Sequence, residues 1–441
     1  MMRMGASKRS DYTLIFATII IVLIGILAVY STAPQQDKTN LCLRHSLFVL
    51  VGLGLLYIAS RINYQLYYQY APHVYVFSIF LLILVLIVGK QVRGSRSWFF
   101  IGSFSFQPVE LTKLTTVLFL SRVILEVKKR SDRFASLLKP IVFAMIPVAL
   151  IILQPDLGSS IIFFPILVVF LYLGGFALSI ISSILLVCGI GLGIPLFITW
   201  INLSQPEYGF GILKPLSIYL SNFSQTLILL LIVIALVGIL FYTGKKYLMM
   251  RWKSTNFIWI GMIITIGVML SHIVRLLIKT YQQQRLIAFL NPAIDPLGTG
   301  YQIIQSEIAI GSGGLFGKGL MAGTQSQLGF LPVQHTDFIF ASLAEELGFV
   351  GAGLILLLYL IFIWRGIAIA LNSRDQYGTY LAMGFVCMYL FPIILNIGMV
   401  MGIMPVTGIP LPLLSYGGSS LTVSLLGIGI LLNIYRRRYI H

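Results

Sequence analysis

Long apolar runs that recur along the whole chain limit its fold more than any other feature. Each is about 17–25 residues long, the length of a helix that crosses the hydrocarbon core of a bilayer. The 441 residues are 58% hydrophobic and only 10% charged, which excludes a soluble domain. The run at 12–30 follows Lys8 and Arg9 and precedes no small-residue cleavage site, so we expect it to remain as the first span. We predict an all-α, polytopic membrane helix bundle, with a single integral membrane domain over residues 1–441.

About twelve spans account for the apolar runs. They are expected at 12–31, 45–60, 74–90, 111–127, 138–154, 158–175, 177–199, 223–243, 256–277, 338–364, 378–400 and 417–435. Most basic clusters between them fall on one side, which the positive-inside rule assigns to the cytoplasm. Both chain ends are then cytoplasmic, which agrees with an even number of spans. The net charge of +17 is explained by this bias, so no nucleic-acid partner is indicated.

Two predicted outer segments carry cations against that bias. Segment 90–110 contains Lys90, Arg93 and Arg96, and the loop 278–337 contains Lys279, Arg285 and Lys318. Cations placed on the outer side suggest an anionic ligand there, and contact with lipid headgroups is the alternative. We expect 278–337 to be the extracytoplasmic functional loop.

Ionisable residues also stand at the ends of predicted spans. Glu110 and Lys113 are three residues apart, which places them on one face of a helix. Asp156 ends another span within the sequence QPDLG. Such groups are costly at membrane depth and usually mark function, although Glu110 and Lys113 could simply neutralise one another.

Asp337 precedes a long apolar run, close to the end of a polar, glycine-rich stretch that begins at Tyr301. A carboxylate there, beside Thr336, could instead cap the following helix. Glu345, offset from Asp337 by about 80° on a helix, could line the same cavity or support the structure.

The glycines of segment 311–319 lack the spacing of a nucleotide phosphate loop. A backbone cradle for a lipid diphosphate and tight packing of the loop are both open. The three cysteines and five histidines show no metal-ligand spacing, which argues against a transition-metal site. A divalent cation between carboxylate and diphosphate oxygens stays open, and no other cofactor is indicated.

Several motifs together resemble the shape, elongation, division and sporulation family, and within it the RodA branch. The resembling segments are 94–98 (GSRSW), 106–113 (FQPVELTK), 154–158 (QPDLG), 291–346, 405–412 (PVTGIPLP) and 415–420 (SYGGSS). They cover most of the chain in the family's order.

The resemblance implies a peptidoglycan glycosyltransferase that polymerises lipid II and acts in cell elongation. It implies work on a polyprenyl-diphosphate glycan at the outer face of the bacterial cytoplasmic membrane, beside a class B penicillin-binding protein. The family's essential outer-loop aspartate falls on Asp337, and its functional glutamate and lysine fall on Glu110 and Lys113. Ser97 stands where members often have Arg, and Val109 stands where they have Ser. Members usually have ten spans, so 200–255 is expected to be an added helical hairpin.

These residues can support a glycosyl transfer. Asp337 is expected to be the catalytic base in an inverting displacement. The substrate-binding set contains Glu110, Asp156 and the cations Arg96, Lys113, Arg285 and Lys318. Two other functions compete with this one, a lipid II flippase and a non-catalytic scaffold for a penicillin-binding protein.

Overall fold

The chain is described from a computed structural model. The described residues are 10–34, 37–92, 94–102, 104–128, 133–208, 220, 222–247, 254–277, 282, 285, 288, 289, 292, 298–331 and 333–438. They form two compact units, one of Met1–Phe176 with Tyr301–His441 and the other of Ala177–Gly300.

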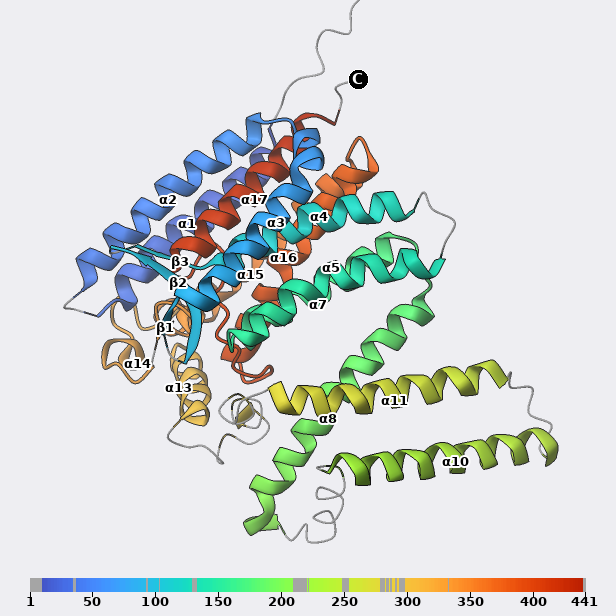
Figure 1. The fold of residues 1–441 in the computed structure, drawn as a ribbon. Helices are drawn as coiled ribbons and strands as arrows, with labels where there is room; N and C mark the ends of the chain where they lie inside the picture. Colours follow the sequence, from blue (N-terminus) through green and yellow to red (C-terminus); the bar gives the residue numbers. More distant parts are fainter. Residues whose placement is uncertain are drawn as a thin grey trace, which may run out of the picture. The chain divides into compact units, whose positions relative to one another are not determined.

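The first unit is a bundle of helices with a small sheet (Figure 1). Its helices are α1 (Tyr12–Thr32), α2 (Lys38–Arg61), α3 (Tyr64–Val88), α4 (Pro108–Val127), α5 (Arg133–Leu153), α6 (Leu157–Ile161), α7 (Phe163–Leu173), α13 (Thr299–Ser312), α14 (Thr324–Gln327), α15 (Ile339–Leu371), α16 (Gln376–Val400) and α17 (Gly418–Arg436). Helix α2 packs along α17, α3 packs along α4, and α15 contacts both α1 and α16. The core lies around α16 and α17, which are the most buried spans.

The second unit contains α8 (Leu178–Tyr208), α10 (Phe223–Tyr247) and α11 (Ser254–Leu277). Helix α11 packs against both α8 and α10. The expected hairpin at 200–255 overlaps α10, and parts of it lie outside the described residues, so it stays a prediction.

The all-α membrane bundle predicted from the sequence is confirmed. Ten helices among the described residues are long and apolar enough to cross a membrane. Two further expected spans correspond to α4, which carries four charged residues, and to Leu157–Leu173, which is shorter and divided between α6 and α7. The total of twelve spans therefore stays a prediction.

Segment 90–106 forms a three-stranded antiparallel sheet that the sequence did not reveal. Strand β2 (Ser95–Ile101) pairs with β1 (Lys90–Val92) and with β3 (Phe104–Phe106). Strand β3 leads directly into α4, and the amide of Gln107 donates to Ser419 Oγ at 3.0 Å. The sheet therefore fixes where α4 begins.

Contacts at the helix ends agree with the predicted sidedness. Asp11 caps α1 and pairs with Arg365 of α15, whose Nε lies 3.0 Å from the carboxylate. At the opposite end of α1, Ser31 donates to Glu346, and the carbonyl of Thr32 accepts from Gln334. The expected cytoplasmic and outer residues thus lie at opposite ends of the same helices, and the orientation itself stays a prediction.

Candidate functional site

Glu110 and Lys113 form a buried ion pair in the first turns of α4. Pro108 starts this helix, and the spacing predicted from the sequence brings Lys113 Nζ to 2.7 Å from Glu110 Oε1. Both side chains are less than a tenth exposed. A buried charge is tolerated only when it is paired, and each of these two residues is the other's partner.

This ion pair lines a small pocket in the first unit. The other lining residues come from α16, from the segment before α17 and from α17 itself: Met388, Tyr389, Pro392, Ile409, Pro410, Pro412, Ser420, Val423 and Ser424. Polar and apolar atoms contribute about equally to the pocket surface, and its wall contains one buried cation and one buried anion. The pocket has room for about one water molecule, so it can admit only a small polar group of a ligand to the ion pair.

Asp156 lies close to the same ion pair. Its carboxylate caps α6 by accepting from the amide of Ser159 at 3.1 Å and from its hydroxyl at 2.8 Å. It also accepts from Gln107 Nε2 at 3.2 Å, just before α4. Burial raises the pKa of Asp156 above its usual value, although the two bonds from Ser159 and the charge of Lys113 oppose this shift; the charge of Glu110 adds to it. The structure thus brings together three of the predicted site residues.

Asp337 immediately precedes α15 and is half-buried. Phe338, and neither Asp337 nor Thr336, is the N-cap residue of α15, and its side chain makes no capping bond. The side-chain amide of Asn396 donates to the carbonyl of Asp337 at 2.9 Å and to that of Ile409 at 2.7 Å. Since Ile409 lines the pocket, Asn396 holds Asp337 beside the pocket wall.

A second set of bonds ties the residues before Asp337 to the segment before α17. Ser415 Oγ donates to the carbonyl of Thr336 at 2.6 Å, and the amide of Tyr416 donates to the carbonyl of His335 at 2.9 Å. Two segments that lie about 80 residues apart are thereby joined. The backbone around Asp337 is thereby tied to the segment that supplies part of the pocket wall.

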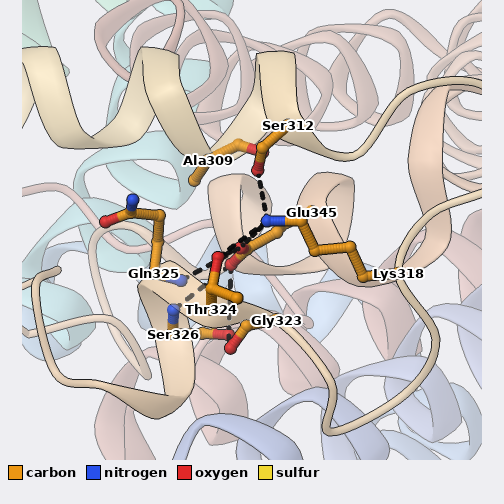
Figure 2. Close-up of polar contacts among 8 residues, drawn as sticks. All are labelled: Ala309, Ser312, Lys318, Gly323, Thr324, Gln325, Ser326 and Glu345. Carbon is orange, nitrogen blue, oxygen red and sulfur yellow. Dashed lines mark hydrogen bonds and ion pairs between the residues drawn. The ribbon is translucent and has the colours of Figure 1, made fainter.

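Lys318 and Glu345 form the centre of a polar cluster under the outer loop, shown in Figure 2. Lys318 Nζ lies 2.8 Å from Glu345 Oε1 and also donates to the hydroxyls of Ser312 and Thr324. Glu345 is fully buried and accepts from Thr324 Oγ1 and from the amides of two α14 residues. Of the two roles open for Glu345, structural support of the loop is the one this geometry favours.

The glycine-rich segment packs tightly against α15. A Cβ on Gly317 would lie 2.1 Å from the carbonyl oxygen of Glu346, and one on Gly313 would lie 2.2 Å from that of Ala344. The amides of Lys318 and Gly319 both donate to α15 carbonyls at 3.0 Å. These amides are therefore already bonded, which favours tight packing over a diphosphate cradle.

Two other predicted cations, Arg96 and Arg285, are not among the residues that line the pocket. Arg96 is exposed on β2, and Arg285 belongs to the second unit. Arg93 and Lys279 lie outside the described residues. Among the residues that are described, no group of three or more His, Cys, Asp or Glu side chains could hold a metal ion, and a divalent cation shared with substrate oxygens stays open.

Sequence reasoning missed Asn396 and Gln107. Asn396 is a fully buried amide inside an apolar run, and a polar side chain at that depth is the signal that could have found it. Gln107 gave no comparable signal, because its contact with Asp156 spans 49 residues of chain.

Comparisons with known proteins identify the family of this chain. A family model described as "Cell cycle protein" (FtsW, RodA and SpoVE) matches residues 11–208 and 208–440. Peptidoglycan glycosyltransferase RodA of Treponema pallidum is 37% identical, over 99% of this chain and all of the relative. Peptidoglycan glycosyltransferase MrdB of Escherichia coli K12 is 33% identical, over 97% of this chain and 94% of the relative.

The fold also matches a solved structure titled "Structural coordination of polymerization and crosslinking by a peptidoglycan synthase complex". The TM-score is 0.63 at 29% identity, with 98% of this chain and 99% of that chain covered. Family model, relatives and fold therefore agree over nearly the whole chain. The chain belongs to the FtsW, RodA and SpoVE family, that of shape, elongation, division and sporulation proteins, and is a multi-pass peptidoglycan glycosyltransferase with a role in cell elongation.

Proposed function

We propose that the chain polymerises lipid II into glycan strands, with Asp337 as the catalytic base. The observation that carries this proposal is the position of Asp337 next to the pocket that contains the Glu110–Lys113 ion pair. A carboxyl residue beside this pocket and a buried cation in its wall are the two kinds of group that the transfer requires. The outer face of the bacterial cytoplasmic membrane is the proposed location, with both chain ends in the cytoplasm.

The reaction needs few groups. The acceptor hydroxyl oxygen of lipid II attacks the anomeric carbon of the growing chain from the face opposite to its diphosphate. The bond between that carbon and the diphosphate oxygen breaks, and the configuration inverts. Asp337 takes the proton from the hydroxyl, and no general acid is required because the diphosphate is a weak base.

Lys113 is the cation best placed to stabilise the departing diphosphate. An ammonium group in a water-poor site acts on a developing charge more strongly than it does in water. Glu110 holds this ammonium in place, and Asp156 lies close enough to act on its charge. Arg96, exposed on β2, could supply a second contact from outside the pocket. Lys318 is assigned first to holding the loop, because it already has three partners.

The charge distribution favours polymerisation over a flippase. A transporter of a charged lipid needs polar groups near the bilayer midplane. In α4 the two ion pairs are Glu110 with Lys113 in the first turns and Arg122 with Glu126 near the end. The charges of this helix therefore gather toward its two ends.

A class B penicillin-binding protein is the proposed partner. The complex that the chain resembles is described as coordinating polymerisation with crosslinking, and a crosslinking enzyme would use the strands made here. A scaffold without catalysis would need neither the buried cation nor the aspartate beside the pocket.

The experiment is polymerisation of lipid II by the purified protein in detergent, with and without the partner. Detergent leaves no bilayer to cross, so only polymerisation produces a signal. We expect glycan polymer from the wild type and from the control Glu126→Gln, which changes an exposed pair, and at least ~10²-fold less from Lys113→Met. Wild-type turnover by Lys113→Met would remove Lys113 from the mechanism, and no polymer from any sample would favour the flippase.

A further inference from the structure

Helix α15 is broken at Gly348, where φ is 68° and ψ is −168°. A break leaves the amides after it and the carbonyls before it without helical partners. The segment 314–319 supplies those partners from outside the helix. After the break, the amide of Phe349 donates to the carbonyl of Gly314 at 2.8 Å, and the amide of Val350 donates to that of Leu315 at 3.1 Å. Before the break, the carbonyls of Glu345 and Glu346 accept from the amides of Lys318 and Gly319.

The side chains at this junction are apolar and exposed. Leu315 and Phe316 are 64% and 81% exposed, and their neighbours across the junction, Phe349 and Val350, are 73% and 46% exposed. We name these four residues the apolar tip. Four large apolar side chains would be costly to leave in water, at about 25 cal/mol for each Å².

The depth of the apolar tip follows from α15 itself. Arg365 pairs with Asp11 at the start of α1 and marks the opposite end of the bundle. Phe349 precedes Arg365 by 16 residues, which is about 24 Å of helix, whereas the hydrocarbon core is about 30 Å thick. The apolar tip therefore lies inside the hydrocarbon of the leaflet that is remote from Arg365.

The surface of α15 below the apolar tip is continuous with it. Leu354, Leu357, Leu360 and Trp364 are each at least half exposed, and their spacing of three or four residues places them on one helical face. This face is the lipid-facing side of a membrane span. Non-helical backbone is tolerated at such depth only when its polar groups are paired, and the bonds across the break pair them.

We infer that the apolar tip inserts into the acyl chains of that leaflet and anchors the outer loop at the membrane surface. The occupant of this surface is lipid, because the apolar tip extends the lipid-facing side of α15 at hydrocarbon depth. The anchor fixes the depth of the Lys318–Glu345 cluster, which is bonded to the same segment. This inference goes beyond the proposed function and does not depend on Asp337.

The test is a depth measurement in lipid nanodiscs. Phe316→Cys carries a spin label in a full-length protein whose three natural cysteines are replaced by Ser and which still polymerises lipid II. Accessibility to oxygen, which concentrates in the acyl chains, is compared with accessibility to a water-soluble nickel chelate. Leu357→Cys is the lipid-facing control, and Asn372→Cys, beyond the end of α15, is the aqueous control.

The expected ratio of oxygen to nickel accessibility at residue 316 matches that at 357 and exceeds that at 372. A ratio like that at 372 would place the apolar tip in water and overturn the inference. Shielding from both reagents would also overturn it, because a partner protein or a second chain would then cover the surface. Leu315→Cys gives a second position if the label at 316 prevents folding.

Discussion

Replacement of Glu345 by Gln tests whether its cluster holds the outer loop. Glu345→Gln keeps the size of the side chain but removes the charge that accepts from Lys318, Thr324 and the amides of Gln325 and Ser326. Hydrogen bonds to a charged acceptor are worth about 1 kcal/mol more than neutral ones, so four of them lose about 4 kcal/mol. Because Lys318 is 27% exposed, water can replace part of its bond to Glu345. We therefore expect the substitution to lower the free energy of local opening of the loop by about 3 kcal/mol.

A loss of about 3 kcal/mol raises local opening on the order of 100-fold, at 1.4 kcal/mol for each factor of ten. The assay is amide hydrogen exchange followed by mass spectrometry, in peptides that cover residues 313–331. Glu126→Gln is the matched control, because Glu126 is exposed, pairs with Arg122 at i,i+4 on the same helix, and such pairs contribute about 0.5 kcal/mol or less. Exchange in Glu345→Gln that stays within about threefold of the wild type would refute the reasoning.

Two further changes test the tight packing of the loop and the positioning of the base. Gly317→Ala places a Cβ 2.1 Å from a carbonyl oxygen, at a residue whose φ is 79°. The control Gly314→Ala has a similar φ of 56°, which costs about 1–2 kcal/mol, but its Cβ meets open space. We therefore expect Gly317→Ala to lower the melting temperature in detergent more than Gly314→Ala does. Equal losses would show that close approach is unimportant. Asn396→Leu removes the bonds to the carbonyls of Asp337 and Ile409. We therefore expect lipid II turnover to fall tenfold or more, with little change in lipid II binding. An equal fall in turnover and binding would indicate a general folding defect and contradict the positioning role.

Features encoded by local spacing could be predicted from the sequence. The expected first span at 12–31 is helix Tyr12–Thr32, because one continuous apolar run fixes both its length and its end. Glu110 and Lys113 were placed on one face by their separation of three residues, and they form an ion pair there. Neither prediction required knowledge of how distant segments meet.

Features that depend on distant contacts could not be predicted. Lys318 and Glu345 lie 27 residues apart, and their pairing depends on the break at Gly348, which a continuous apolar run conceals. Lys318 was consequently grouped with the cations for substrate. The sheet at 90–106 was also missed, because its short strands mix polar and aromatic residues without a clear period of two.

The central claim is that a carboxylate beside the pocket removes the proton of the acceptor hydroxyl. Its most direct test measures lipid II turnover and lipid II binding on the same purified Asp337→Asn protein. Loss of a general base predicts turnover lower by about 10²–10⁴-fold, with binding unchanged because Lys113 remains in place. Turnover close to that of the wild type in a protein that folds and binds lipid II would contradict the account.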